Sequence, residues 1–197
     1  MINVFGKEQM LSDTNHLLSD DQIADFVING YHIVAPQFQS DFHERVYQEL
    51  NDLPTNPGDE INKAVPKIDD VYEHPAVHGA LTSLLGSDYK RAAHRHCHKN
   101  HPGTRSQTWH QDSLNIPTLA DGHGRVSDHV QSVLAMYYPQ AVTEKMGPTA
   151  LIPGSHLFTA STDRNASNGN FRDQVVAVVP AGSVLILHYD IWHAGTA

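Results

Sequence analysis

The sequence contains a single cysteine, Cys97, so no disulfide can form within the chain. It also lacks the run of about 18 apolar residues that a membrane-spanning helix requires, and its polar start does not resemble a signal peptide. Basic residues are few, because 13 Lys and Arg stand against 22 Asp and Glu and give a net charge of −9. These shortages argue against a nucleic-acid-binding surface and a membrane protein, and they make a cytoplasmic location the expectation.

The first part of the chain has the residue pattern of helices. The 197 residues suffice for one domain, and a hydrophobic content of 40% predicts a folded chain. Ser19 begins a capping box, and Gly30 is a suitable helix stop. We expect helices that begin at Ser19, at Ser40 and at Pro75, with a short strand at 31–34. The expected single domain, 1–197, therefore opens with a helical layer over 15–86.

The rest of the chain has the pattern of a β structure. Short apolar segments rich in β-branched residues alternate with turns that contain Gly and Pro, and they lie at 130–139, 150–152, 175–179 and 184–187. The polar segments 119–128 and 159–174 are expected to be loops. Helices followed by many short strands predict a mostly β fold, with a β-sandwich or barrel over 87–197 behind the N-terminal helices.

Candidate metal ligands occur in two separate places. His110 and Asp112 are two residues apart, so on an extended strand both side chains lie on the same side. Three further candidates, His188, Asp190 and His193, follow the apolar segment 184–187, and their spacing does not select among them. Two imidazoles and one carboxylate occupy three positions of an octahedral metal and leave three open, as in non-haem Fe(II) oxygenases. The same ligands also suit a catalytic zinc ion.

Two other groups of polar residues have alternative interpretations. Thr149 lies in a short apolar segment between turns, where its hydroxyl either points into a cavity or belongs to a structural hairpin. His94, His96 and His98 alternate and would share one face of a strand. We interpret them as a wall of the substrate cavity, with solvent-facing histidines or a second metal site that includes His101 as the alternatives.

Three blocks of this sequence together resemble the phytanoyl-CoA dioxygenase family. They are Trp-His-Gln-Asp at 109–112, Gly-Pro-Thr-Ala-Leu-Ile-Pro-Gly-Ser-His at 147–156, and the segment 182–193. The similarity extends over 15–197 and includes the segment 25–34. It implies an Fe(II)- and 2-oxoglutarate-dependent dioxygenase on a double-stranded β-helix, a jelly-roll or cupin-like barrel. Such an enzyme uses O₂ and hydroxylates an unactivated C–H bond of a small molecule; the oligomeric state is left open.

The resemblance also implies roles for individual residues. It selects His193 over His188 as the second imidazole, because the family's ligand follows a short bulge after the apolar strand. The implied metal ligands, which are also the implied catalytic residues, are His110, Asp112 and His193. The implied 2-oxoglutarate contacts are Gln107 and Thr149.

The chain departs from the family at its end. Family members hold the distal carboxylate of 2-oxoglutarate with an Arg on the strand after the second His, but this sequence stops at Ala197. We therefore expect a C-terminally incomplete barrel that lacks its final strand, unless another arginine replaces the missing one. The candidates are Arg105, Arg125, Arg164 and Arg172. Two alternative functions are a non-catalytic or degenerate barrel that binds a metal or small ligand, and a zinc-dependent hydrolase.

Overall fold

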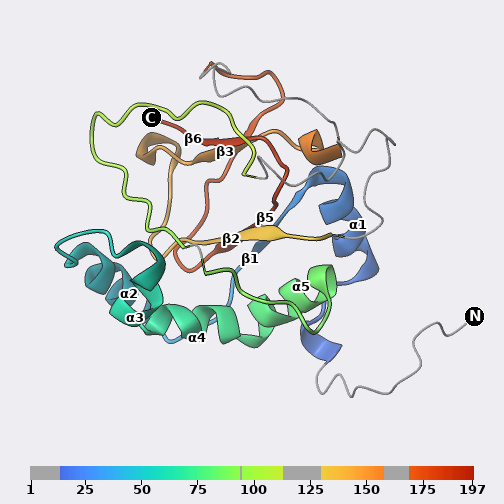
Figure 1. Ribbon diagram of the computed structural model, residues 1–197, viewed down its shortest axis with the longest axis horizontal. Helices are drawn as coiled ribbons and strands as arrows, with labels where there is room; N and C mark the ends of the chain where they lie inside the picture. The colour runs from blue at the N-terminus through green and yellow to red at the C-terminus, as the bar shows by residue number, and fades with distance from the viewer. Residues whose placement is uncertain (1–13, 94, 113–129, 158–168) are drawn as a thin grey trace, which may run out of the picture.

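The computed structural model describes residues 14–93, 95–112, 130–157 and 169–197 (Figure 1). Short 3₁₀ helices occur at 14–16, 58–60, 144–146 and 155–157. The α-helices are α1 Asp20–Asn29, α2 Phe42–Asn51, α3 Ile61–Ala64, α4 Lys67–Glu73 and α5 Pro75–Leu85. The strands are β1 Tyr31–Val34, β2 Val133–Tyr137, β3 Thr149–Leu151, β4 Val175–Val176, β5 Val184–His188 and β6 His193–Gly195.

Local sequence signals set the start and end of α1 as predicted. The Ser19 hydroxyl accepts a hydrogen bond from the Gln22 amide at 3.3 Å, and the Gln22 side chain accepts one from the Ser19 amide at 2.9 Å. Gly30 ends the helix with φ at +81°, a conformation that suits glycine. The chain then enters β1 directly, so the predicted strand at 31–34 is confirmed.

The other helices agree only partly with the expectation. The α5 helix runs from Pro75 to Leu85 as predicted, with Val77 and Leu81 buried. The α2 helix begins at Phe42, later than expected for a helix capped by Ser40. Asp41 occupies the position before the helix, and no side chain caps that end. The short helices α3 and α4 were not predicted.

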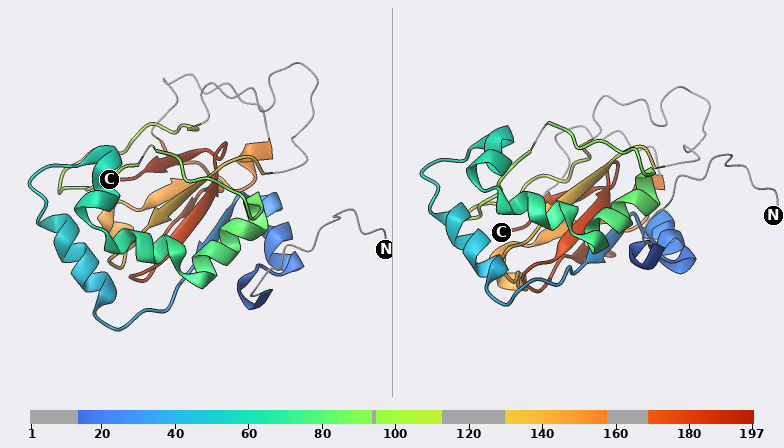
Figure 2. Two further views of the ribbon diagram at one scale, coloured as in Figure 1. Left: turned by 60° about the horizontal axis from the view of Figure 1, so that its bottom comes forward. Right: turned by 90° about the horizontal axis from the view of Figure 1, so that it is seen from below.

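The strands form two antiparallel sheets of three strands each. The first has the order β1-β5-β2 and the second the order β4-β3-β6. Figure 1 shows the two sheets as separate layers, and Figure 2 shows α4 and α5 along the outer face of the first sheet. The chain is thus built of small antiparallel sheets with helices, as the strand pattern predicted. Closure into a jelly-roll barrel stays a prediction.

Strand β5 divides the core into two parts. Its residues Val184 and Ile186 pack with the buried side chains of the helices, whereas Leu185 and Leu187 face the other way and pack with Leu151 of the second sheet. Because side chains alternate along a strand, one fully buried segment serves both interfaces. The layer between the two sheets is the part of the core that the candidate site adjoins.

Some expectations for the middle of the chain are wrong or lie outside the described residues. Residues 95–109 form no strand, so His96 and His98 do not share a strand face; His94 is outside the described residues. The predicted loop 119–128 is also outside them, as is most of 159–174. No helix in the described part of the chain is long and apolar enough to span a membrane.

Candidate metal centre

Two of the predicted ligands, His110 and His193, are held side by side by the backbone. Each residue's amide donates to the other's carbonyl at 3.0 Å, which forms an antiparallel bridge between segments that are far apart in the sequence. Directly opposed residues project to the same side, and the two imidazole rings lie 4.4 Å apart between centroids. Trp109, the preceding residue, packs on the opposite side against Ala150 and Ala194.

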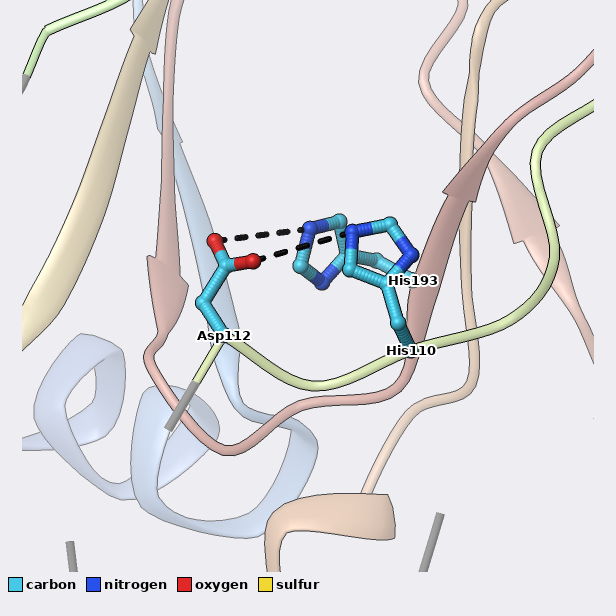
Figure 3. A group of neighbouring side chains, drawn as sticks. All are labelled: His110, Asp112 and His193. Atoms are coloured by element: carbon cyan, nitrogen blue, oxygen red, sulfur yellow. Dashed lines mark ion pairs between the residues drawn. The ribbon is translucent and has the colours of Figure 1, made fainter. Parts of the chain in front are cut away.

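Asp112 completes a group of three ligand atoms. Its Oδ1 lies 3.6 Å from Nε2 of His110, and its Oδ2 lies 3.8 Å from Nε2 of His193 (Figure 3). One ligand atom from each residue falls within 4.8 Å of the others. Metal bonds of about 2.1 Å at right angles place neighbouring ligands roughly 3 Å apart. A small contraction would therefore fit all three residues around one ion.

The hydrogen bonds of the two imidazoles prepare them as ligands. Nδ1 of His110 lies 2.9 Å from the Thr108 carbonyl, and Nδ1 of His193 lies 3.1 Å from the Ile191 carbonyl. A carbonyl only accepts, so both rings carry their proton on Nδ1. Each Nε2 is then left with a lone pair that faces Asp112. Backbone partners that fix the tautomer in this way are typical of metal-ligating histidines.

Burial favours the uncharged form that coordination requires. The His193 side chain is 8% exposed, whereas those of His110 and Asp112 are each 31% exposed. Burial lowers the pKa of His193 below its ordinary range. A neutral imidazole is therefore present at neutral pH without displacement of a proton. The site thus combines one buried candidate ligand with two that are partly exposed.

The structure separates the other two C-terminal candidates from this group. The His188 ring lies 4.7 Å from the ring of His156, and its Nδ1 lies 3.9 Å from Oδ2 of Asp190. Neither His188 nor Asp190 belongs to a group of three ligands within the described ranges, where the His110, Asp112 and His193 group is found. His98 lies close enough to His110 and Asp112 to interact with them electrostatically.

The two predicted co-substrate contacts lie on either side of β6. The Gln107 side-chain oxygen accepts a hydrogen bond from the Gly195 amide at 2.8 Å. Thr149 of β3 lies opposite Gly195 of β6. Leu151, two residues further along β3, lies opposite His193. Thr149 and His193 therefore share one face of the second sheet. The Thr149 hydroxyl lies 3.0 Å from the hydroxyl of Tyr138.

Sequence reasoning missed Tyr138 as a residue of this region. It follows Leu134 and Met136 at intervals of two, and all three pack in the layer between the sheets. This alternation could have placed Tyr138 on the inner face. Of the four candidate arginines, Arg105 and Arg172 are exposed, and Arg125 and Arg164 are outside the described residues.

Two antiparallel sheets that carry two imidazoles and a carboxylate aimed at one point have the ligand set of 2-His-1-carboxylate iron oxygenases. The phytanoyl-CoA dioxygenase family matches residues 14–197, and the chain belongs to that family. The predicted resemblance is confirmed. No curated protein matches the chain closely enough in sequence to count as a relative.

Several solved structures share the fold. The non-haem alpha-ketoglutarate-dependent carbocyclase SnoK from nogalamycin biosynthesis has 16% identity and a TM-score of 0.62, over 91% of this chain and 78% of that one. HygX from Streptomyces hygroscopicus, with nickel, 2-oxoglutarate and hygromycin B bound, has 17% identity and a TM-score of 0.62, over 91% and 81%. CytC3 with Fe(II) and alpha-ketoglutarate has 19% identity and a TM-score of 0.59, over 92% and 72%.

Proposed function

We propose that the protein is an Fe(II)- and 2-oxoglutarate-dependent dioxygenase that hydroxylates an unactivated C–H bond of a small molecule. The observation that carries this proposal is the position of the two Nε2 atoms, at 3.6 and 3.8 Å from the oxygens of one carboxylate. Both atoms are left free to coordinate, because each Nδ1 is engaged with a backbone carbonyl. Membership of the family and the iron and 2-oxoglutarate bound by similar structures support the choice of metal and co-substrate.

The residues have distinct roles in this proposal. His110, Asp112 and His193 would hold the metal ion and would leave coordination positions free for 2-oxoglutarate and O₂. Asp112 also neutralises part of the metal charge, and its presence as a ligand favours hydroxylation over halogenation, which needs that position for a halide. Gln107 and Thr149 contact the co-substrate. Bound Fe(II), with 2-oxoglutarate and O₂, supplies an oxidant able to break a C–H bond.

The proposal extends to the fold and the substrate. The two sheets are the facing halves of a double-stranded β-helix within one domain, 1–197, located in the cytoplasm. HygX has been crystallised with hygromycin B, and the epimerase SnoN, another solved structure similar to this chain, with nogalamycin RO. These structures support a small molecule of comparable complexity as the substrate class.

Succinate release is the measurement that tests this function. We expect the protein to convert 2-oxoglutarate to succinate only when Fe(II) and O₂ are both present, and zinc to give no turnover. Asp112→Ala should lower the rate by at least about a hundredfold, because it removes one of three ligands. Asp70→Ala, which removes an exposed carboxylate from α4, is the matched control and should turn over at the wild-type rate.

The result distinguishes the proposed function from its alternatives. A degenerate barrel would bind Fe(II) and release no succinate. A zinc hydrolase would be inactive with Fe(II) and 2-oxoglutarate but active with zinc on an ester or amide. Equal succinate release by Asp112→Ala and the wild type would remove Asp112 from the metal site.

A further inference from the structure

The turn that leads into β6 has a firmly held backbone. It covers residues 189–192 and connects β5 with His193, and both Asp190 and Ile191 within it are buried. Every backbone amide from Tyr189 to His193 donates to a described partner at 2.9–3.2 Å. In chain order, the partners are the Ser132 carbonyl, Nδ1 of His188, the His188 carbonyl, the Ser155 hydroxyl and the His110 carbonyl. This turn is therefore a fixed point beside His193.

The segment that carries the other two candidate ligands is paired with β6 only as far as His110. The Gln107 amide donates to the Gly195 carbonyl at 2.8 Å, and His110 exchanges two hydrogen bonds with His193. Within the described part of the chain, the backbone groups of Gln111 and Asp112 make no hydrogen bond. The β pairing therefore positions His110 and does not extend to Asp112.

The Gln111 side chain connects this segment with the turn. Its Nε2 donates a hydrogen bond to the carbonyl oxygen of Asp190. Figure 3 shows the side chains of His110 and Asp112 on the same side of the chain, toward His193. Gln111 lies between these two residues in sequence. Its bond therefore ties the chain immediately before Asp112 to a point three residues before His193.

We propose that Gln111 is a positioning residue of the metal centre, whose hydrogen bond to the Asp190 carbonyl keeps the Asp112 carboxylate beside the two imidazoles. This inference rests on the proposed function. The carboxylate lies 3.6 and 3.8 Å from the two Nε2 atoms, and its oxygens have no hydrogen bond in the described ranges that would hold them there. A rotation of the chain after His110 would carry Asp112 away and leave only the two imidazoles in place.

The chemistry of glutamine suits this position. Its amide donates to a carbonyl without bringing a charge next to the metal ion, whereas lysine would bring a positive one and an ionised glutamate has no proton to donate. Methionine has a similar length and no donor. Asparagine keeps the amide and is shorter by one carbon–carbon bond of about 1.5 Å, a change that a hydrogen bond does not tolerate. These two residues therefore separate the donor from the reach of the side chain.

The alternative is a bond that only satisfies the buried carbonyl of Asp190. Its loss would then lower the stability of the fold and leave the Fe(II) affinity of the folded protein unchanged. A positioning role acts through Asp112, so its effect on Fe(II) affinity should disappear once the carboxylate is removed. A double-mutant cycle between Gln111 and Asp112 measures this coupling.

The experiment is an anaerobic calorimetric titration of Fe(II) into the full chain. Gln111→Met and Gln111→Asn should each weaken binding by about tenfold to a hundredfold, the usual effect of losing a residue that orients a metal ligand. In the Asp112→Ala background, Gln111→Met should change the affinity by less than about twofold. Gln37→Met is the matched control, because the Gln37 amide also donates to a backbone carbonyl, that of Ala35 at 3.1 Å; it should bind like the wild type. Unfolding by urea verifies that each variant is folded.

Other results would overturn the inference. If Gln111→Met binds Fe(II) like the wild type, or weakens binding equally with and without the Asp112 carboxylate, Gln111 does not position Asp112, and the proposed function is unaffected. If the wild type binds no Fe(II), the inference and the proposed function both fail. If Gln111→Met does not fold, the same cycle with Gln111→Asn decides the question alone.

Discussion

At the residue scale, two pairs of buried or partly buried histidines within the described ranges have different environments. In the proposed metal centre, His110 and His193 face the Asp112 carboxylate with unprotonated Nε2 atoms. In the second pair, His156 and His188 lie 4.7 Å apart between ring centroids, and both belong to the packed region beside α1. Asp190 is nearby, and its Oδ1 and Nδ1 of His156 are buried without a hydrogen-bond partner among the described residues. Protonation of this second pair would place positive charge in a poorly solvated position.

The second pair predicts a loss of stability in acid. Burial lowers the pKa of His188 to about 4, with the charge of His156 adding to the shift and Asp190 opposing it. Burial also lowers the pKa of His156. Between pH 6.5, the ordinary value, and about 4, the unfolded chain binds more protons than the folded protein, so the stability of the fold decreases as pH falls. The expected loss from pH 7 to pH 5 is on the order of 1–2 kcal/mol.

Urea unfolding of the metal-free protein at several pH values measures this effect. His188→Gln has no titrating group and should show a weaker dependence of unfolding free energy on pH than the wild type. His78→Gln, a change at an exposed histidine of α5, is the matched control and should keep the wild-type dependence. An identical pH dependence in His188→Gln and the wild type would contradict the assignment.

At the scale of elements, the junction between α1 and β1 fixes how the helix meets the sheets. Gly30 has φ at +81°, and a Cβ built there would lie 2.4 Å from Nδ1 of His156. His156 is itself tied to α1, because its Nε2 lies 3.0 Å from the Val27 carbonyl. The short 3₁₀ helix at 155–157 can approach α1 this closely only because residue 30 has no side chain.

Gly30→Ala should therefore destabilise the protein by more than backbone strain alone. Gly58→Ala is the matched control, since Gly58 also has a positive φ, +57°, but a Cβ there would meet nothing within 4 Å. We expect about 1–2 kcal/mol for the control from the left-handed conformation, and about 1–3 kcal/mol more for Gly30→Ala from the collision with His156. The measurement is the free energy of unfolding in urea. Equal losses of unfolding free energy in the two variants would show that the close approach of His156 to residue 30 does not contribute to stability.

Elements with strong local signals could be predicted from the sequence. The capping box at Ser19, the stop at Gly30 and the apolar segment 184–187 each specify their structure by local chemistry, and the structure agrees with them. The helices α3 and α4 have only 4 and 7 residues, too short for a clear helical period. At residues 95–109 the prediction was wrong in the other direction, because the alternating His residues indicated a strand and the structure has none there.

The candidate site was predictable in part for similar reasons. The proposed ligands His110, Asp112 and His193 could be selected because the resemblance to the family points to them, although spacing alone left His188 and Asp190 open. Tyr138 could not be connected with Thr149 from sequence, because their contact depends on how the two sheets face each other. Tertiary packing of this kind leaves no mark on local periodicity.

At the scale of the whole molecule, the proposed metal centre joins parts of the chain that are distant in sequence. His193 belongs to β6 of the second sheet, and His110 belongs to the segment 107–112, which pairs with β6 through the His110–His193 bridge and through Gln107 and Gly195. Asp112 lies at the last residue before the undescribed stretch 113–129. A metal bound by all three residues would hold the segment 110–112 against β6. Fe(II) should therefore raise the unfolding temperature of the wild type, by mass action, and should not raise that of Asp112→Ala.

The most direct test of the account is whether these three residues, and not their neighbours, form one metal site. Anaerobic equilibrium titration with Fe(II) should give one bound ion per chain in the wild type. His110→Ala, Asp112→Ala and His193→Ala should each weaken binding by at least about a hundredfold, and His188→Gln should bind like the wild type. If His193→Ala binds Fe(II) normally while His188→Gln does not, the proposed metal centre is wrong.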